Sequence, residues 1–276
     1  MISREQFHAL AAGHRVVPVT RTLLADLTTP VAAFARWCGP DAPTDGSPAR
    51  AGFLLESVDH GGRWSRWSFV GRDPRLRLVA RGAAVEITGN LPGGLVQELP
   101  TDRGVLATLE VLLEHLSTPS AALLASVTGV DEVDLPPLHS GVIGYLGYDV
   151  VREVEALPDV PEDDRGRPDA VLSVIGEIAA YDHWSQQVTL VANAFVAPDA
   201  GPDAVDAAFD DAVARLERMA ADGATPLDEP LVEPPTKADD SVQVVSSMAG
   251  GAYEAAVEVA KEHILAGDIF QVVLAQ

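Results

Sequence analysis

The 276-residue chain carries 19 basic and 41 acidic side chains, and its formal charge of −22 disfavours binding to nucleic acids and anionic membrane surfaces. Hydrophobic residues make up 47% of the sequence, which is enough for the core of one large domain or two modest ones. Cys38 is the only cysteine, and the sequence shows neither the pattern of a signal peptide nor an 18-residue apolar run. These features predict a cytoplasmic protein without intrachain disulfides.

The first 40 residues predict a helix, a strand and a second helix. Ser3 and Gln6 stand at capping-box spacing at the start of a helix over residues 3–12. Residues 16–24 are strand-like. The run Thr-Thr-Pro that ends at Pro30 favours the start of a second helix, because threonine caps a helix and proline is tolerated in its first turn.

Residues 53–71, FLLESVDHGGRWSRWSFVG, predict a β-hairpin with a polar end. The apolar run 53–55 predicts a strand that ends at Glu56 and Ser57, and the alternating run 66–70 predicts its partner beyond a Gly-rich turn. A carboxylate at this point can bind an ammonium group, and a hydroxyl can donate or accept a hydrogen bond. We therefore expect a small ligand to bind here, although each of the two residues on its own is also typical of a structural turn.

A group of arginines lies within and after this hairpin. Its members are Arg63, Arg66, Arg72, Arg75, Arg77 and Arg81. In so acidic a chain they could form a local site for an anionic substrate. Solvated arginines at strand edges would give the same pattern, and the sequence supports both interpretations equally.

The middle of the chain alternates between strand and helix patterns. The expected strands are 75–80, 84–88, 141–149, 169–182 and 187–196, and the expected helices are 104–116 and 202–222. Three glycines at spacing three within 141–149 indicate close backbone approach or bulges, because glycine weakens a strand. His183, in the turn before the last strand, is expected to be solvent-exposed rather than a catalytic base.

The last 50 residues contain the most specific pattern. Residues 224–243 are rich in Pro, Asp and Glu and form the best linker candidate. A helix over 252–266 is followed by a glycine stop and by a predicted strand over 269–275. The predicted organisation is a first domain over 1–223, a linker over 224–243 and the start of a second domain over 244–276.

The order of these motifs resembles component I of the anthranilate synthases, which are chorismate-utilising enzymes. The resemblance rests on L-L-E-S at 54–57, R-W-S-F-V-G at 66–71, G-x-x-G-Y-x-G-Y-D at 141–149, and Tyr253, Val257, Lys261 and Ile264 before the run G-D-I-F-Q-V-V-L at 267–274. It implies an α+β fold of antiparallel β-sheets with helices packed outside. It also implies an N-terminal regulatory domain that senses tryptophan, followed by the start of a chorismate-binding catalytic domain. Within that regulatory domain Ser57, with Glu56 beside it, would bind tryptophan as a feedback inhibitor, and Pro30 would line the same pocket.

The resemblance further implies a reaction, a cofactor and a partner. The reaction is the conversion of chorismate and ammonia into anthranilate and pyruvate, with Mg²⁺ as the cofactor. The metal ligands and the acid–base groups are expected outside these 276 residues, which by themselves would then be inactive on chorismate. Ammonia would come from a glutamine amidotransferase subunit, component II, because Cys38 lacks the setting of a catalytic nucleophile.

Gln271 separates this chain from some relatives of that family. Isochorismate and salicylate synthases carry a lysine there that can activate water, whereas glutamine cannot take up a proton. We therefore expect Gln271 to lie on an active-site strand and the nucleophile to be ammonia, although a buried glutamine could also serve only to bond the neighbouring backbone. Val273 favours anthranilate synthase over aminodeoxychorismate synthase component I of the folate pathway, which stays an alternative. A non-catalytic tryptophan-binding module is the other.

Overall fold

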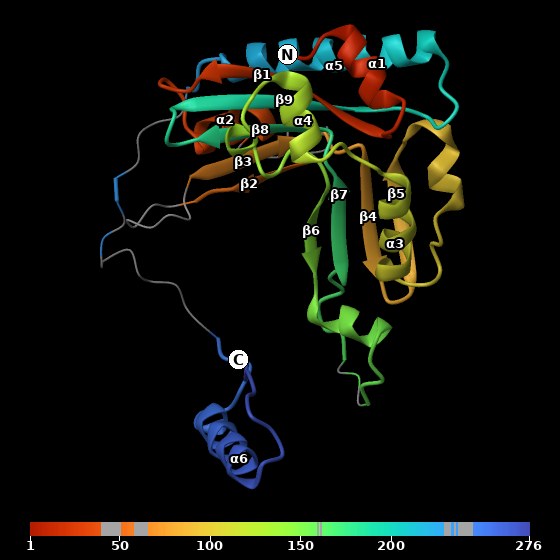
Figure 1. The fold of residues 1–276 in the computed structure, drawn as a ribbon. Helices are drawn as coiled ribbons and strands as arrows, with labels where there is room; N and C mark the ends of the chain where they lie inside the picture. Colours follow the sequence, from red (N-terminus) through yellow and green to blue (C-terminus); the bar gives the residue numbers. More distant parts are fainter. Residues whose placement is uncertain are drawn as a thin grey trace. The chain divides into compact units, whose positions relative to one another are not determined.

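The computed structural model describes the chain in several stretches. These are residues 1–39, 51–57, 66–158, 160, 162–228, 233–234, 236 and 245–276. The chain divides into two compact units, Met1–Leu227 and Asp228–Gln276, and each is described here by itself (Figure 1). Among the described residues, no helix combines the length and the apolar character that a membrane crossing requires.

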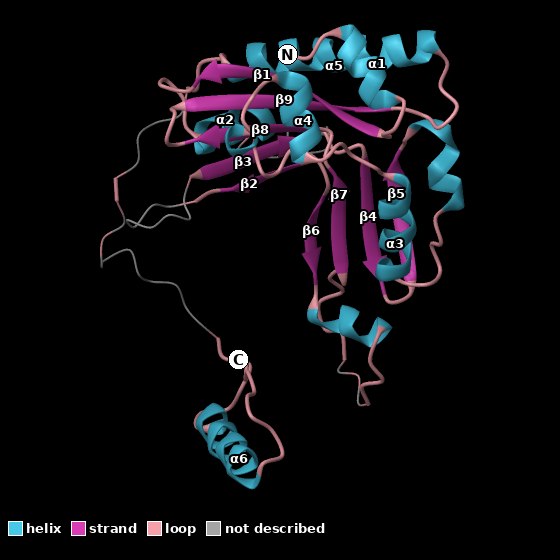
Figure 2. Cartoon of the chain, viewed as in Figure 1, coloured by secondary structure: helices cyan, strands magenta, loops and turns pink. Residues whose placement is uncertain are grey.

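The first unit contains a five-stranded antiparallel sheet, which we call sheet A (Figure 2). Its strands, in spatial order, are β1 (Val16–Leu24), β9 (Gln187–Phe195), β8 (Glu177–Asp182), β3 (Trp67–Arg72) and β2 (Gly52–Leu55). The predicted hairpin is confirmed, since β2 and β3 are antiparallel neighbours in which Phe53 pairs with Gly71 and Leu55 pairs with Phe69. The predicted strand over residues 16–24 is also confirmed.

Helices form the core with sheet A. They are α1 (Arg4–Ala11), α2 (Pro30–Cys38), α4 (Ala121–Thr128) and α5 (Pro202–Gly223). Phe7, Trp37 and Leu216 are among the large buried side chains that fill the space between helices and strands. The capping box predicted at Ser3 and Gln6 is present at the start of α1.

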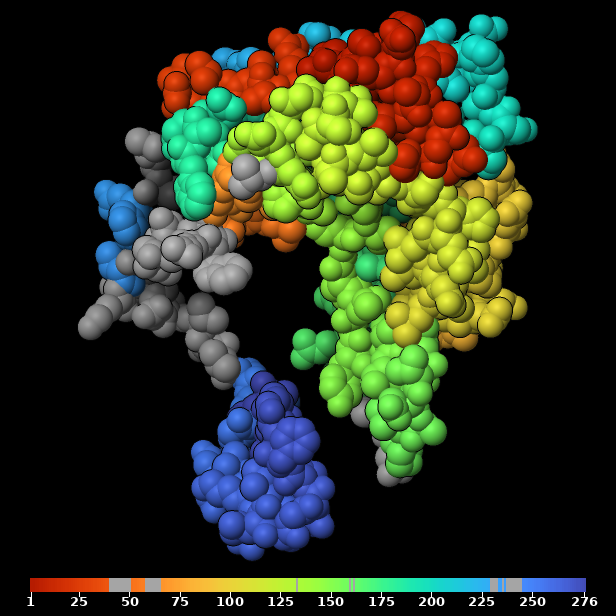
Figure 3. Space-filling model, in the orientation of Figure 1, coloured from red at the N-terminus to blue at the C-terminus, as the bar shows by residue number. Residues whose placement is uncertain are grey.

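Helix α4 was not expected from the sequence. It is only eight residues long and lies in a stretch rich in small residues, so it offers little periodicity. Its signals are local ones: the hydroxyl of Ser120 accepts from the N–H of Leu123, and Gly129 ends the helix with left-handed φ and ψ angles. Gln6 of α1 donates to the carbonyl oxygen of Val127, and Figure 3 shows α4 packed against the N-terminal residues.

A second antiparallel sheet, sheet B, completes the first unit. Its strands, in spatial order, are β5 (Ala84–Gly89), β4 (Leu76–Arg81), β7 (Ala170–Val174) and β6 (Val142–Leu146). Helix α3 (Val105–His115) and the 3₁₀ turns η1 (Pro92–Glu98) share its core, in which Leu76, Leu78 and Leu112 are fully buried. The predicted α+β class with antiparallel sheets is therefore confirmed, while a regulatory role for this unit stays a prediction.

The chain changes sheet at two places that lie side by side. The expected single strand over residues 169–182 is wrong, because β7 belongs to sheet B and β8 to sheet A, with a corner at Gly176 between them. The chain also changes sheet between β3 and β4, and the connection there includes Asp73. This connection lies against Gly176, where a Cβ atom would collide with the carbonyl oxygen of Asp73. Both strands are apolar, so the sequence pattern continued through the corner. Figure 2 shows the strands of the two sheets running at a steep angle to each other.

One of the glycines within residues 141–149, Gly144, allows the close backbone approach that the sequence indicated. Gly144 has a φ of +156°, and a Cβ atom there would collide with the carbonyl oxygen of Val171 on the neighbouring strand. The strand is shorter than predicted, because β6 ends at Leu146 and the chain turns into the 3₁₀ segment η3 (Tyr148–Glu153).

In the second unit, the predicted helix over 252–266 is confirmed as α6 (Ala252–Ala266). The predicted strand over residues 269–275 is wrong, because the segment is irregular. It contacts α6 where the hydroxyl of Tyr253 donates a long hydrogen bond, of 3.5 Å, to the carbonyl oxygen of Leu274. An extended segment becomes a strand only when a neighbouring strand takes its hydrogen bonds, and the described part of this unit contains no strand.

The N-terminal cap of α2 gives a first testable expectation. The hydroxyl of Thr29 accepts from the N–H of Ala32 at 3.1 Å. We expect Thr29→Ala to lower the free energy of unfolding by about 1 kcal/mol, as measured by urea denaturation. The control is Ser126→Ala, whose exposed hydroxyl bonds only within its own helix, and it should stay within about 0.5 kcal/mol of the parent. Equal effects of the two variants would show that the cap contributes nothing specific.

Candidate functional site

The two residues predicted to bind an inhibitor lie at the end of an edge strand. Glu56 and Ser57 follow β2 directly, and β2 is at one edge of sheet A. The side chain of Glu56 is exposed, and Ser57 is half-buried. The Gly-rich turn of the predicted hairpin lies outside the described residues. The exposed carboxylate is thus accessible to a ligand with an ammonium group.

A buried hydroxyl holds the backbone at this point. The N–H of Ser57 donates to the Oγ atom of Ser68, 3.1 Å away on β3, and Ser68 is fully buried. The same Oγ atom lies 2.8 Å from the Nε2 atom of His183. His183 is half-buried rather than solvent-exposed, so the sequence-based expectation for this histidine is wrong. Sequence reasoning missed Ser68 altogether, because a single serine in an apolar strand carries no signal of its own.

The turn that carries His183 is fixed by an ion pair. The guanidinium of Arg66 binds both carboxylate oxygens of Asp182, with Nε–Oδ1 and Nη2–Oδ2 distances of 2.9 and 2.7 Å. The carboxylate also accepts from the N–H of Trp184 and from the hydroxyl of Ser185. Burial by itself would raise the pKa of Asp182, but the hydrogen bonds from Arg66, Ser185 and Trp184 outweigh burial and hold the pKa at about 2. This carboxylate therefore stays ionised at neutral pH.

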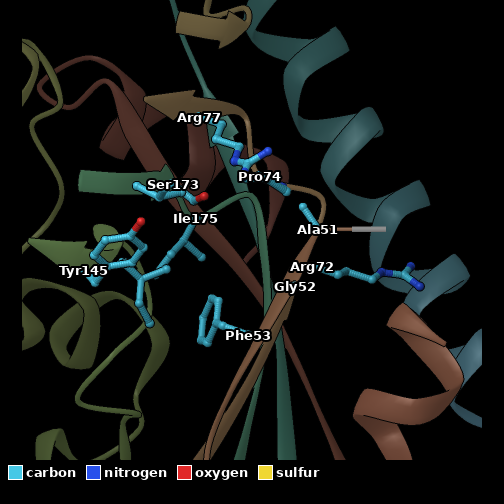
Figure 4. A pocket seen from close by; sticks show the side chains of 12 residues that line it. Ala51, Gly52, Phe53, Arg72, Pro74, Arg77, Tyr145, Ser173 and Ile175 are labelled. Atoms are coloured by element: carbon cyan, nitrogen blue, oxygen red, sulfur yellow. The ribbon is translucent and has the colours of Figure 1, made fainter. Parts of the chain in front are cut away.

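A pocket of about 460 Å³ lies between the two sheets (Figure 4). Phe53, Tyr145 and Ile175 form apolar walls, and Arg77 and Ser173 add a cation and a hydroxyl. The ring of Phe53 lies against Gly71, where any side chain would collide with it. Apolar walls with a few polar groups are typical of sites for small molecules.

The arginine cluster suggested by the sequence is dispersed in the structure, and Arg63 lies outside the described residues. Two of them form ion pairs: Arg66 with Asp182 and Asp134, and Arg72 with Glu177 and Asp222. The guanidinium of Arg75 lies over the ring of Phe195, and Arg81 donates to the carbonyl oxygen of Gly166. Arg77 lines the pocket. Most of these arginines therefore have structural partners. The described members do not converge on one anion site.

The arginine with the most deeply buried partner joins sheet A to α5. The Nε atom of Arg72 lies 2.7 Å from a carboxylate oxygen of Glu177, and its Nη1 atom lies 2.6 Å from Asp222 on α5. Figure 4 shows the side chain of Arg72 directed away from the centre of the pocket. Arg215, also on α5, lies 4.0 Å from the other oxygen of Glu177. Burial raises the pKa of Glu177 and lowers the pKa of Arg215, so this group is a structural network rather than an exposed binding site.

Comparison with known proteins adds evidence that the geometry alone does not give. The model of the chorismate binding enzyme family matches residues 104–276. This chain belongs to that family. The match begins at the start of α3, so the chorismate binding enzyme family model covers much of the first unit as well as all of the second. The domain boundaries expected from the sequence stay a prediction.

The curated relatives agree with the predicted resemblance, which is thereby confirmed. Anthranilate synthase component 1 of Mycobacterium bovis is 39% identical over 280 residues, which cover 99% of this chain and 48% of the relative. The protein of the same name from Mycolicibacterium smegmatis is 41% identical over 217 residues, which cover 79% of this chain and 37% of the relative. The chain thus spans about half the length of the curated relatives it matches.

A solved structure was also matched. The crystal structure of anthranilate synthase component I from Streptococcus pneumoniae aligns with 89% of this chain and 46% of that chain, at 19% sequence identity and a TM-score of 0.44.

Two predictions for this chorismate binding enzyme family member have no structural counterpart here. Gln271 is exposed in an irregular segment rather than on a strand, and its part in an active site stays a prediction. Nowhere in the described ranges do three His, Cys, Asp or Glu side chains come together as a metal-binding group. The expectation that the Mg²⁺ ligands lie outside these residues stays a prediction.

Proposed function

We propose that this chain serves in an anthranilate synthase, as the component that converts chorismate and ammonia into anthranilate and pyruvate. The observation that supports this most directly is its 39% identity to an anthranilate synthase component 1 over 99% of its length. The valine at position 273, where aminodeoxychorismate synthases usually carry asparagine, supports the same choice. Mg²⁺ belongs to the proposal as a cofactor: its ligands are expected outside these residues, and when bound it would supply a Lewis acid.

The proposal includes a partner that supplies ammonia, a glutamine amidotransferase subunit. Cys38 supports this, because it is buried and its Sγ atom lies 4.0 Å from the carbonyl oxygen of Gly71, between α2 and the sheet. A thiol in that position is not accessible as the nucleophile that glutamine hydrolysis requires. Cys38 is therefore not a candidate for that nucleophile, in agreement with a separate source of ammonia.

The proposal also includes inhibition by tryptophan at the end of β2. Glu56 offers an exposed carboxylate for the ammonium group, and the hydroxyl of Ser57 can bond the carboxylate of the amino acid. The apolar pocket beside Phe53, on the same strand, would suit an aromatic ring. Pro30, at the start of α2, belongs to a helix that packs against β2 and β3. Proline at this position also favours the start of α2, because the first turn of a helix tolerates its missing N–H.

One assay tests the reaction and its regulation together. The whole protein encoded by the gene is incubated with chorismate, Mg²⁺ and ammonia, with and without tryptophan, and anthranilate is followed by its fluorescence. We expect anthranilate to form and tryptophan to suppress it. Formation of aminodeoxychorismate instead would reject the proposed product. Residues 1–276 assayed in the same way test the expectation that they are inactive by themselves.

Substitution at the end of β2 tests the inhibitor site. We expect Ser57→Ala and Glu56→Ala each to raise the inhibition constant for tryptophan at least about fivefold, because each removes a hydrogen-bonding or charged partner of the amino acid. Glu86→Ala is the control, since Glu86 is an exposed glutamate on β5, an edge strand of the other sheet. It should change neither turnover nor inhibition. If the two site variants lose activity and inhibition in equal proportion, this segment has a structural role only.

A further inference from the structure

The backbone of Glu56 and Ser57 is not held by strand pairing. The ladder between β2 and β3 ends where Leu55 pairs with Phe69, so the next residues have no partner in it. The bond from the N–H of Ser57 to the hydroxyl of Ser68 takes over at this point. A side chain of the neighbouring strand thus fixes the backbone just where the exposed carboxylate of Glu56 begins the proposed site.

The hydroxyl of Ser68 is itself oriented by a histidine. Because Ser68 is fully buried, its proton needs an acceptor within the protein, and the Nε2 atom of His183 lies 2.8 Å away. The oxygen accepts from the N–H of Ser57, and Nε2 of His183 is the acceptor within reach of the hydroxyl proton. With the hydroxyl donating to Nε2, the imidazole carries its own proton on Nδ1. The order of donors runs from Ser57 to Ser68 and on to His183.

The position of His183 is fixed in turn by the hairpin between β8 and β9. The backbone N–H of His183 donates to the carbonyl oxygen of Arg66, at a distance of 2.9 Å. The guanidinium of Arg66 is bound by Asp182 and lies over the rings of Trp67 and Trp184, 4.9 and 5.1 Å from their centres. The imidazole is therefore attached to a turn with little freedom to move.

We propose that Ser68 and His183 are positioning residues of the tryptophan site: they hold the backbone at Ser57 so that Glu56 and Ser57 present their side chains to the inhibitor. This inference rests on the proposed function. It assigns to the turn between β8 and β9 a part in inhibitor binding without contact with the inhibitor. His183 acts through Ser68, and Ser68 acts through the N–H of Ser57.

The first test reads the hydrogen bonds without any ligand, on the protein labelled with ¹⁵N. At a pH where the imidazole is neutral, His183 should show a protonated Nδ1 and an unprotonated Nε2. We expect Ser68→Ala to remove this preference and to speed amide hydrogen exchange at Ser57 at least about fivefold. An unchanged tautomer and unchanged exchange at Ser57 in a folded Ser68→Ala protein would overturn the proposal.

The second test reads inhibition and uses a conservative rescue. Ser68→Ala and His183→Ala should each raise the inhibition constant for tryptophan at least about fivefold. The inhibition constant of His183→Gln should stay within about twofold of that of the parent, because the amide oxygen of glutamine can accept the hydrogen bond that Nε2 accepts. The control is Thr189→Ala, a half-buried position on β9 whose hydroxyl bonds to the hydroxyl of Thr22. If His183→Gln is as weakly inhibited as His183→Ala, the imidazole acts by bulk and not by the hydrogen bond.

Failure of this inference is distinguishable from failure of the proposed function. If tryptophan does not inhibit the parent protein, or if Ser57→Ala changes nothing, the inhibitor site itself is rejected. If Ser57→Ala weakens inhibition while Ser68→Ala and His183→Ala leave both inhibition and amide exchange unchanged, the site stands and the positioning role is rejected.

Discussion

Replacing Arg72 with methionine is expected to lower the free energy of unfolding by about 3–5 kcal/mol at neutral pH, because it leaves a carboxylate buried without its nearest cation. Glu177 is 2% exposed, and its oxygen lies 2.7 Å from the Nε atom of Arg72. The other arginine near it, Arg215, is 4.0 Å away and has bonds to Asp211 and to backbone carbonyls. Methionine keeps most of the aliphatic stem, so the change removes mainly the charge.

The pH dependence of this variant identifies the cause. Burial already raises the pKa of Glu177, and loss of the hydrogen bond from Arg72 removes an interaction that lowers it. The folded variant then binds a proton more tightly than the unfolded chain does, so its deficit is largest at high pH and shrinks as the pH falls towards the folded pKa. Urea denaturation between neutral pH and about pH 5 measures this trend.

Arg4→Met is the matched control for Arg72→Met. Arg4 also binds two carboxylates, Asp206 and Asp210, but its side chain is 45% exposed and all three groups remain in contact with water. We expect only a small change in the denaturation midpoint there, since exposed ion pairs contribute little. Equal losses in the two variants, or a deficit of Arg72→Met that is independent of pH, would contradict the role of the buried charge.

Asp182→Asn is expected to lower the free energy of unfolding by about 2–3 kcal/mol at neutral pH. The pKa of Asp182 is held at about 2 in the folded protein, whereas an unfolded aspartate has a pKa of about 3.9. A difference of about two units corresponds to about 2–3 kcal/mol of stabilisation by the ionised form. Because the folded pKa is the lower one, this contribution is fully present above about pH 4 and is lost as the pH falls through about 2.

The measurement is the difference in unfolding free energy between the parent and Asp182→Asn as the pH is lowered from neutrality. This difference should decrease below about pH 4, because the parent then loses the stabilisation by the ionised carboxylate, which asparagine lacks at every pH. Asp149→Asn serves as control: Asp149 pairs with Arg152 at 2.7 Å, but its side chain is 52% exposed, and we expect a cost below about 1 kcal/mol. A difference for Asp182→Asn that stays constant down to about pH 2 would show that another property of the turn is responsible.

Elements with strong local signals were predictable from the sequence. The capping box at Ser3 and Gln6 and the glycine after residue 266 indicate where α1 begins and α6 ends, because the groups that cap a helix are its neighbours in the chain. The alternation around Ser68 indicated a strand for the same reason: side chains of a strand point to opposite faces in turn. These signals and the motif order were enough to identify the family resemblance.

Other features depended on segments that are far apart in the sequence. Strands β7 and β8 are similar apolar runs, and only their different partners, β4 and β3, place them in different sheets. The irregular segment after α6 shows the converse, because a sequence suited to a strand does not become one without a neighbour.

The sequence by itself determined the class of fold, most helices and strands, and the family. Only the tertiary structure decided that Ser68 meets His183, 115 positions later, and that Arg72 meets Glu177, 105 positions later. The reason is physical: capping and alternation act between residues a few positions apart, whereas a buried hydroxyl or carboxylate takes its partner from whichever strand folding brings beside it.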